Sequence, residues 1–195
     1  MKNIFKILFA IILFSIPMVS CEMLDGLDEQ KDPEIAKTAT YPMNGEWWVT
    51  YRLDDGTGNL VDAGIVWGYG ELGHFKALTY NTVENVSNKL WITDVDGLSY
   101  DASGNFWSYR VVTNLDLSAK SFSVDTAANA AYDSHGNPYE IQVTVKNGKV
   151  ILGGGLSRTG VVTDSIYYEM EFSDDPGNIY YVAGHRRTGF YEDEY

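Results

Sequence analysis

From Gly45 to the C-terminus, apolar and polar residues alternate with a period of two, and this pattern limits what the chain can form. Ile141, Val143 and Val145, for example, are separated by Gln142 and Thr144. Such alternation is typical of antiparallel strands with one buried and one solvated face. No stretch after residue 40 has the apolar period of a helix, so the sequence predicts an all-β sandwich or barrel.

Turns rich in Asp, Gly and Asn separate the predicted strands. The strands are expected at 45–52, 65–69, 75–80, 89–94, 105–116, 121–125, 139–146, 165–173 and 179–187. Asn147-Gly148, between two lysines, is a strong signal for a two-residue hairpin. We therefore expect one strand to end there and another to begin.

The first predicted strand reads G-E-W-W-V-T-Y-R over Gly45–Arg52, with Trp47, Val49 and Tyr51 on one face. The last strand carries Arg186 and Arg187, cations that can close over an aromatic ring. If they do, the first and last strands are neighbours. The sequence then predicts, over 45–195, a single antiparallel up-and-down β-barrel of about eight strands.

The N-terminus has the layout of a secretory signal. Residues 1–20 begin with Lys2 and Lys6, continue through a short apolar run and end just before Cys21, the single cysteine. The segment M-V-S-C at 18–21 resembles a bacterial lipobox. We therefore expect removal of residues 1–20, acylation of Cys21 and a flexible linker over 21–44, so that the protein is anchored to a membrane by acyl chains.

Charge limits the partners of the mature chain. Removal of two lysines from fourteen basic residues leaves 12 against 27 acidic residues, a net charge of −15. Such a surface repels nucleic acid, which we do not expect as a partner.

The polar residues suggest no catalytic or metal site and no cofactor. There is no G-x-S-x-G, no H-E-x-x-H and no calcium-loop pattern, and the three histidines lack the spacing of metal ligands. The spacing of a carboxylate pair in space is left open by the sequence.

Aromatic residues are abundant: five tryptophans, eight phenylalanines and fourteen tyrosines. Small barrels of about eight strands often hold one apolar ligand, and tyrosine suits an amphipathic one because its ring carries a hydroxyl. Seven residues are candidates for either the wall of a ligand cavity or plain core: Trp67, Tyr69, Trp91, Trp107, Tyr109, Tyr168 and Met170.

The mature domain resembles a family of Bacteroidetes lipoproteins known as lipid-binding putative hydrolases, with a lipocalin-like fold. The resemblance rests on Gly45-Glu46-Trp47 and on G-H-R-R-T-G-F at 184–190. Lipocalins carry G-x-W on their first strand and a late arginine that packs on that tryptophan. The T-D-Y signature of lipocalins is imperfect here, because Ser165 and Ile166 separate Thr163-Asp164 from Tyr167.

The resemblance implies a membrane-anchored protein of the cell envelope, on the outer membrane, that binds a lipid or another apolar or amphipathic small molecule. We expect a monomer. Two alternatives stay open: a surface accessory protein that binds a glycan or a partner protein through exposed aromatics, and a hydrolase.

Overall fold

The computed structural model describes residues 37–64, 73–95, 98–99, 106–132 and 136–195. The strands are β1 (Gly45–Asp54), β2 (Leu60–Asp62), β3 (Phe75–Asn81), β4 (Lys89–Asp94), β5 (Leu98–Ser99), β6 (Phe106–Trp107), β7 (Arg110–Asp116), β8 (Ser121–Ala128), β9 (Gln142–Leu156), β10 (Val162–Phe172) and β11 (Tyr180–Arg186). A short 3₁₀ helix, η2 (Tyr191–Asp193), lies near the C-terminus.

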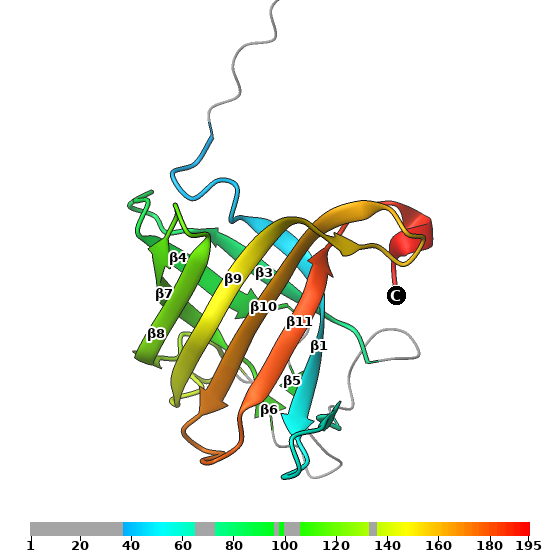
Figure 1. Cartoon of the computed structure of the whole chain (residues 1–195). Helices are drawn as coiled ribbons and strands as arrows, with labels where there is room; N and C mark the ends of the chain where they lie inside the picture. Colours follow the sequence, from blue (N-terminus) through cyan, green and yellow to red (C-terminus); the bar gives the residue numbers. More distant parts are fainter. Residues whose placement is uncertain (1–36, 65–72, 96–97, 100–105, 133–135) are drawn as a thin grey trace, which may run out of the picture. The chain divides into compact units, whose positions relative to one another are not determined.

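Eight of these strands form a closed antiparallel barrel (Figure 1). The strand order is β1-β3-β4-β7-β8-β9-β10-β11, and β11 pairs back onto β1 with Trp47 opposite Arg186. Neighbouring strands follow one another in the chain, so this is an up-and-down barrel, as the alternation predicts. β2 pairs with the last three residues of β1, and β5 and β6 pair with each other in a separate two-stranded sheet.

The inward residues are buried as the period of two predicts. Val49 and Tyr51 of β1 are buried, and so are Tyr109 and Val111 along β7. On β10 the buried row is Ile166, Tyr168, Met170 and Phe172, each less than 3% exposed. These side chains belong to one continuous core.

The hairpin predicted at Asn147-Gly148 is wrong. β9 runs through both residues without a break, and its pairing with β8 and with β10 shifts register there. Asn147 has φ 53°, and a Cβ on Gly148 would lie 2.4 Å from the ring of Phe122. The dipeptide therefore forms a β-bulge, which uses the same backbone freedom as a turn but lets the strand continue.

The predicted strand 105–116 is interrupted at Ser108 and Tyr109, between β6 and β7. The predicted strand 65–69 lies outside the described residues. Residues 38–44, which the sequence assigns to the linker, pack on the barrel, where Thr40 and Met43 are fully buried. The described part of the chain contains no helix long and apolar enough to cross a membrane.

Candidate functional site

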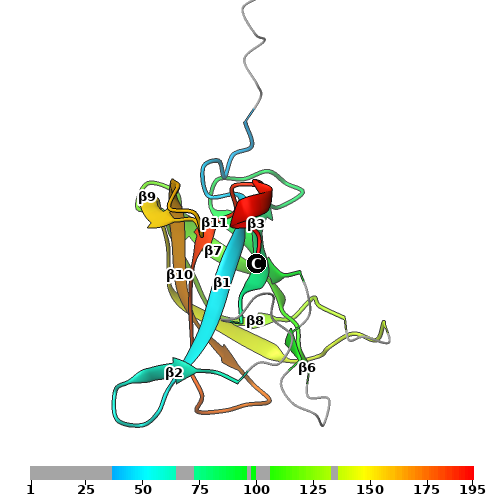
Figure 2. The ribbon, with the colours of Figure 1, turned by 90° about the vertical axis from the view of Figure 1, so that its right-hand side faces the viewer.

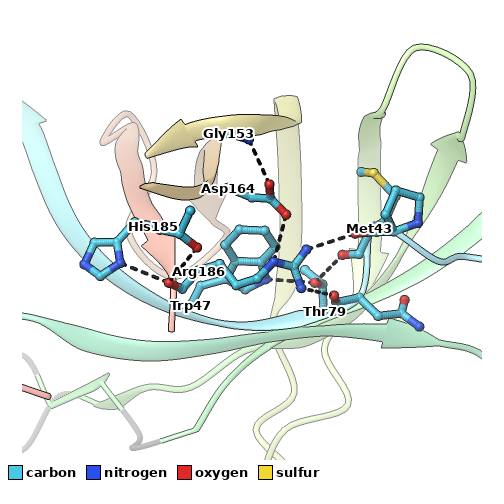
Figure 3. A network of polar contacts seen from close by, with 10 residues as sticks. Met43, Trp47, Thr79, Gly153, Asp164, His185 and Arg186 are labelled. Carbon is cyan, nitrogen blue, oxygen red and sulfur yellow. Dashed lines mark hydrogen bonds and ion pairs between the residues drawn. The ribbon is translucent and has the colours of Figure 1, made fainter. Parts of the chain in front are cut away.

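One end of the barrel is closed by Arg186 and Trp47 (Figure 3). The guanidinium carbon lies 4.5 Å from the centroid of the fully buried Trp47 ring, the contact that the sequence predicts. Arg186 also donates to Asp164 at 2.9 Å, to the Pro42 carbonyl at 2.9 Å and to the Asn44 carbonyl. The arginine therefore ties β11 to the segment before β1.

Gly45 and Thr79 complete this closure. A Cβ at residue 45 would lie 2.3 Å from a terminal nitrogen of Arg186, so glycine leaves the room that the guanidinium occupies. The Trp47 indole N–H donates to Thr79 Oγ1 at 2.8 Å, and that hydroxyl donates to the Met43 carbonyl at 2.6 Å. Glycine at position 45 therefore leaves space for Arg186, and tryptophan at position 47 is held by its hydrogen bond to Thr79.

Arg187, the other predicted closing residue, points elsewhere. It forms ion pairs with Glu46 and Glu194, each at 2.6 Å. These contacts are partly exposed, so Arg187 fastens the outside of the barrel and does not cover Trp47.

Three tyrosine hydroxyls meet inside the barrel. Tyr51 Oη lies 2.8 Å from Tyr109 Oη, which lies 2.6 Å from Tyr168 Oη, and all three side chains are at most 2% exposed. We call these residues the phenol chain. They come from β1, β7 and β10, three strands that the closed barrel brings face to face.

The three hydroxyls of the phenol chain bond to one another. Besides the Tyr51–Tyr109 and Tyr109–Tyr168 contacts, Tyr51 and Tyr168 also interact as hydrogen-bond partners. Each phenol has one O–H to donate and an oxygen that can accept. The phenol chain is therefore a compact polar group in an apolar interior.

Burial keeps the phenols neutral. Loss of hydration is the largest cause that raises the pKa of Tyr51 and Tyr109 well above 10, and the pKa of Tyr168 is raised for the same reason. All three hydroxyls thus stay protonated near neutral pH and act as hydrogen-bond donors.

A carboxylate also lies on the inner face, near the phenol chain. Asp94 is 7% exposed and ends β4, where its Oδ1 accepts from the Tyr109 backbone N–H at 2.7 Å and from the Ser108 hydroxyl at 2.9 Å. Its negative charge contributes to the raised pKa of each phenol. The alternation that buries Leu90 and Ile92 also places Asp94 inside, a signal that the sequence contains.

The structure brings together three of the seven predicted ligand-binding residues. Tyr109, Tyr168 and Met170 are buried side by side in the core, with Met170 1% exposed. Trp67 and Tyr69 lie outside the described residues, as does the side chain of Trp107.

Trp91 lies on the outer face, between the buried Leu90 and Ile92, so it is not a wall of the interior. Its ring stacks beside Tyr80 with centroids 6.2 Å apart, and the Arg110 guanidinium lies 5.2 Å from its centroid. The strict alternation of β4 accounts for this position, because Trp91 has the opposite parity to the two core residues.

An open groove of about 430 Å³ lies over the ends of β7 and β8, beside the bulge of β9. Its polar lining comes from Asn114, Asp116, Ser121, Ser123 and Asn147. None of the predicted ligand-binding residues lines it.

Trp48 packs on the outside of the barrel, a role that the sequence did not reveal. It is 1% exposed because the Tyr195 ring covers it edge-on, with centroids 5.4 Å apart. The His74 ring stacks on the Tyr195 ring, with centroids 3.6 Å apart. Tyr195 thus fastens the C-terminal segment to the outer wall of the barrel.

Ser157, His185 and Asp193 are buried in the same region, but their bonds are not those of a hydrolase triad. Asp193 accepts from Thr159 and Thr188 at 2.6–2.8 Å. The His185 ring nitrogens face the Arg186 carbonyl and the Tyr195 hydroxyl. A catalytic triad needs the histidine between the nucleophile and the carboxylate. Here Asp193 instead joins the turn between β9 and β10 to the C-terminal segment.

The described residues contain no group of three or more His, Cys, Asp or Glu side chains that could hold a metal ion. A comparison with curated proteins finds no match. A family model described as "Lipid-binding putative hydrolase" matches residues 32–191, which covers the whole barrel. The chain therefore belongs to the lipid-binding putative hydrolase family.

Proposed function

We propose that this protein holds an amphipathic lipid or a similar small molecule inside the barrel, with the polar head of the ligand at the phenol chain. The observation that carries the proposal is the meeting of three buried phenol hydroxyls, of Tyr51, Tyr109 and Tyr168, within an apolar interior. Phenols both donate and accept, so they offer hydrogen-bond partners to the polar head of a molecule whose remainder is apolar.

The chemistry of the phenol chain favours a particular head group. Neutral donors bind an acceptor such as a carboxylate, phosphate or ester oxygen, and they do so without a counter-charge. The buried Asp94 adds negative charge nearby, which disfavours an anionic head and favours an ester, amide or protonated acid. Met170, Phe172 and Val182 supply apolar contacts for the adjoining chain of the ligand.

The proposal includes an anchor at Cys21, because the preceding residues have the order of a lipoprotein signal. Two or more acyl chains hold a protein on a bilayer stably, whereas one chain binds marginally. The barrel is then a tethered carrier at the cell envelope, next to the membrane that supplies its ligand.

Titration of intrinsic tryptophan fluorescence tests ligand binding. Saturable quenching or a spectral shift is expected with a monoacylglycerol or a fatty acid, and Tyr168→Phe should weaken the affinity about 2- to 12-fold, the worth of one hydrogen bond. Tyr132→Phe, at a 60% exposed position, is the matched control and should bind like the wild type. A flat titration across lipid classes with a folded barrel would contradict the proposal.

A second function is favoured by the outer Trp91–Tyr80–Arg110 group, in which a half-buried indole and an exposed cation lie together. Such a surface suits a glycan or a partner protein. Screening on a glycan array should then show binding that Trp91→Ala abolishes, while the lipid titration is unchanged. Absence of any Trp91-dependent binding would remove this candidate.

A further inference from the structure

The hairpin between β9 and β10 exposes apolar side chains at one end of the barrel. Leu156 and Val162 are cross-strand partners and are 62% and 68% exposed. We call six exposed residues of this region the apolar rim: Ile151, Leu152, Leu156, Val162, Phe190 and Tyr191. Single exposed apolar residues are common, but a group at one place marks an interaction surface.

The apolar rim is held in place by the fold. Thr159, in the turn of the hairpin, donates its N–H to Asp193 at 2.8 Å, and Arg158 donates to the Glu194 carbonyl at 2.9 Å. These bonds join the hairpin to the segment that carries Phe190 and Tyr191. At Gly155 a Cβ would lie 3.0 Å from His185 Cβ, so the hairpin also packs closely on β11.

The rim lies at the end of the barrel where the chain enters. Figures 1 and 2 both show the β9–β10 hairpin, η2 and the segment that begins at Thr38 at the same end, and β2 at the opposite end. Residues 21–37 span at most about 60 Å when fully extended. An anchor at Cys21 therefore keeps this end within reach of the bilayer.

We propose that the apolar rim docks on the surface of the bilayer that holds the Cys21 anchor, and so points this end of the barrel at the membrane. The docking rests on the proposed anchor. Aliphatic side chains next to Phe190 and Tyr191 suit the boundary between head groups and acyl chains. Arg158 and Glu192 give the rim charges of both signs, which fits zwitterionic lipid. The net charge of −15 that remains after removal of residues 1–20 disfavours anionic lipid.

Depth-dependent quenching tests the docking. The acylated protein with Leu156→Cys carries an environment-sensitive fluorophore, since an acylated Cys21 has no free thiol, and is placed in phosphatidylcholine vesicles containing doxyl-labelled lipid. Val61→Cys in β2, at a 44% exposed position at the far end, is the matched control. We expect a blue shift at residue 156 and several-fold stronger quenching there than at 61. Tyr191→Cys, at a 92% exposed position, provides a second label on the rim and should behave like residue 156.

The other outcomes overturn the docking in distinguishable ways. Equal, weak quenching at 156 and 61 in protein that floats with the vesicles means that the anchor holds and the rim stays in water. Weak quenching in protein that does not float means that both the anchor and the docking fail. A blue shift that needs no lipid and grows with protein concentration means that a second copy of the chain covers the rim instead.

Discussion

At the scale of single residues, Arg186 shows how one side chain can support the seam at which β1 and β11 close the barrel. It covers Trp47 and donates to Asp164, Pro42 and Asn44. The sequence predicts that an arginine of the last strand meets the tryptophan, because both lie at the ends of the strand series. It leaves open which of the two arginines does so, since that depends on the register of β1 against β11.

Arg186→Met should lower the free energy of unfolding by about 2–3 kcal/mol, because it removes a cation–π contact and charge-assisted hydrogen bonds at a mostly buried site. Arg187→Met is the matched control. Its ion pairs are partly exposed, and such pairs contribute about 0–1 kcal/mol. Urea unfolding measures both, and equal losses for the two variants would contradict the assignment of Arg186 as the closing residue.

At the scale of elements, the bulge of β9 shows where local signals fail. Asn-Gly adopts the backbone of a hairpin turn, and nothing in the neighbouring residues distinguishes a turn from a bulge. The choice is made by β8 and β10, which both pair with β9 on either side of residues 147–148. Period-two alternation identified β3, β4, β7, β8 and β10, because each has one face in the core.

Gly148→Ala should destabilise the barrel by about 1–3 kcal/mol, since the new methyl group would lie 2.4 Å from the Phe122 ring and 2.5 Å from its carbonyl oxygen. Lys146→Ala, two residues away at an exposed position, should change stability by less than about 1 kcal/mol. Thermal unfolding separates them. If the glycine variant melted like the lysine variant, the bulge would not be packed as described.

The C-terminal segment should loosen as the pH falls. Burial, followed by His185 and Arg158, lowers the pKa of His74 below 6.5, so the unfolded or released form takes up a proton more readily than the packed form. Packing of Tyr195 on His74 is therefore fully present above pH 6.5 and weakens below it. Trimming by carboxypeptidase should speed up between pH 7 and pH 5.

The matched variant for this prediction is His74→Phe, which keeps a ring against Tyr195 but cannot be protonated. Its trimming rate should be nearly constant over the same pH range, after correction for the activity of the peptidase on a model peptide. A wild-type rate that is equally constant would show that His74 does not control the segment.

At the scale of the whole molecule, the sequence and the structure give different parts of the proposed lipid carrier. The predicted signal and the predicted acylation of Cys21 rest on the sequence alone, because they depend on residue order. The phenol chain is legible only in the structure, because its three members are 58 and 59 residues apart and meet through barrel closure. Asp94 could be predicted in part. The alternation along β4 predicts that its side chain is buried, but only the structure shows its hydrogen bonds to Ser108 and Tyr109.

Cys21→Ala should abolish membrane anchoring. Without the thiol that receives the first acyl chain, the chain should stay unprocessed or be released, and it should leave the detergent-rich phase in a phase-separation experiment. Ligand binding by the barrel, measured after solubilisation, should be unchanged. Unaltered partitioning of the variant into the detergent phase would refute acylation at this residue.

Native mass spectrometry of protein purified from its own membrane tests whether the barrel holds one amphipathic molecule at the phenol chain. We expect an adduct of one lipid-sized mass per barrel, retained by Tyr132→Phe and reduced in Tyr168→Phe. A wild-type spectrum without any adduct, from protein with an intact β-barrel by circular dichroism, would contradict it.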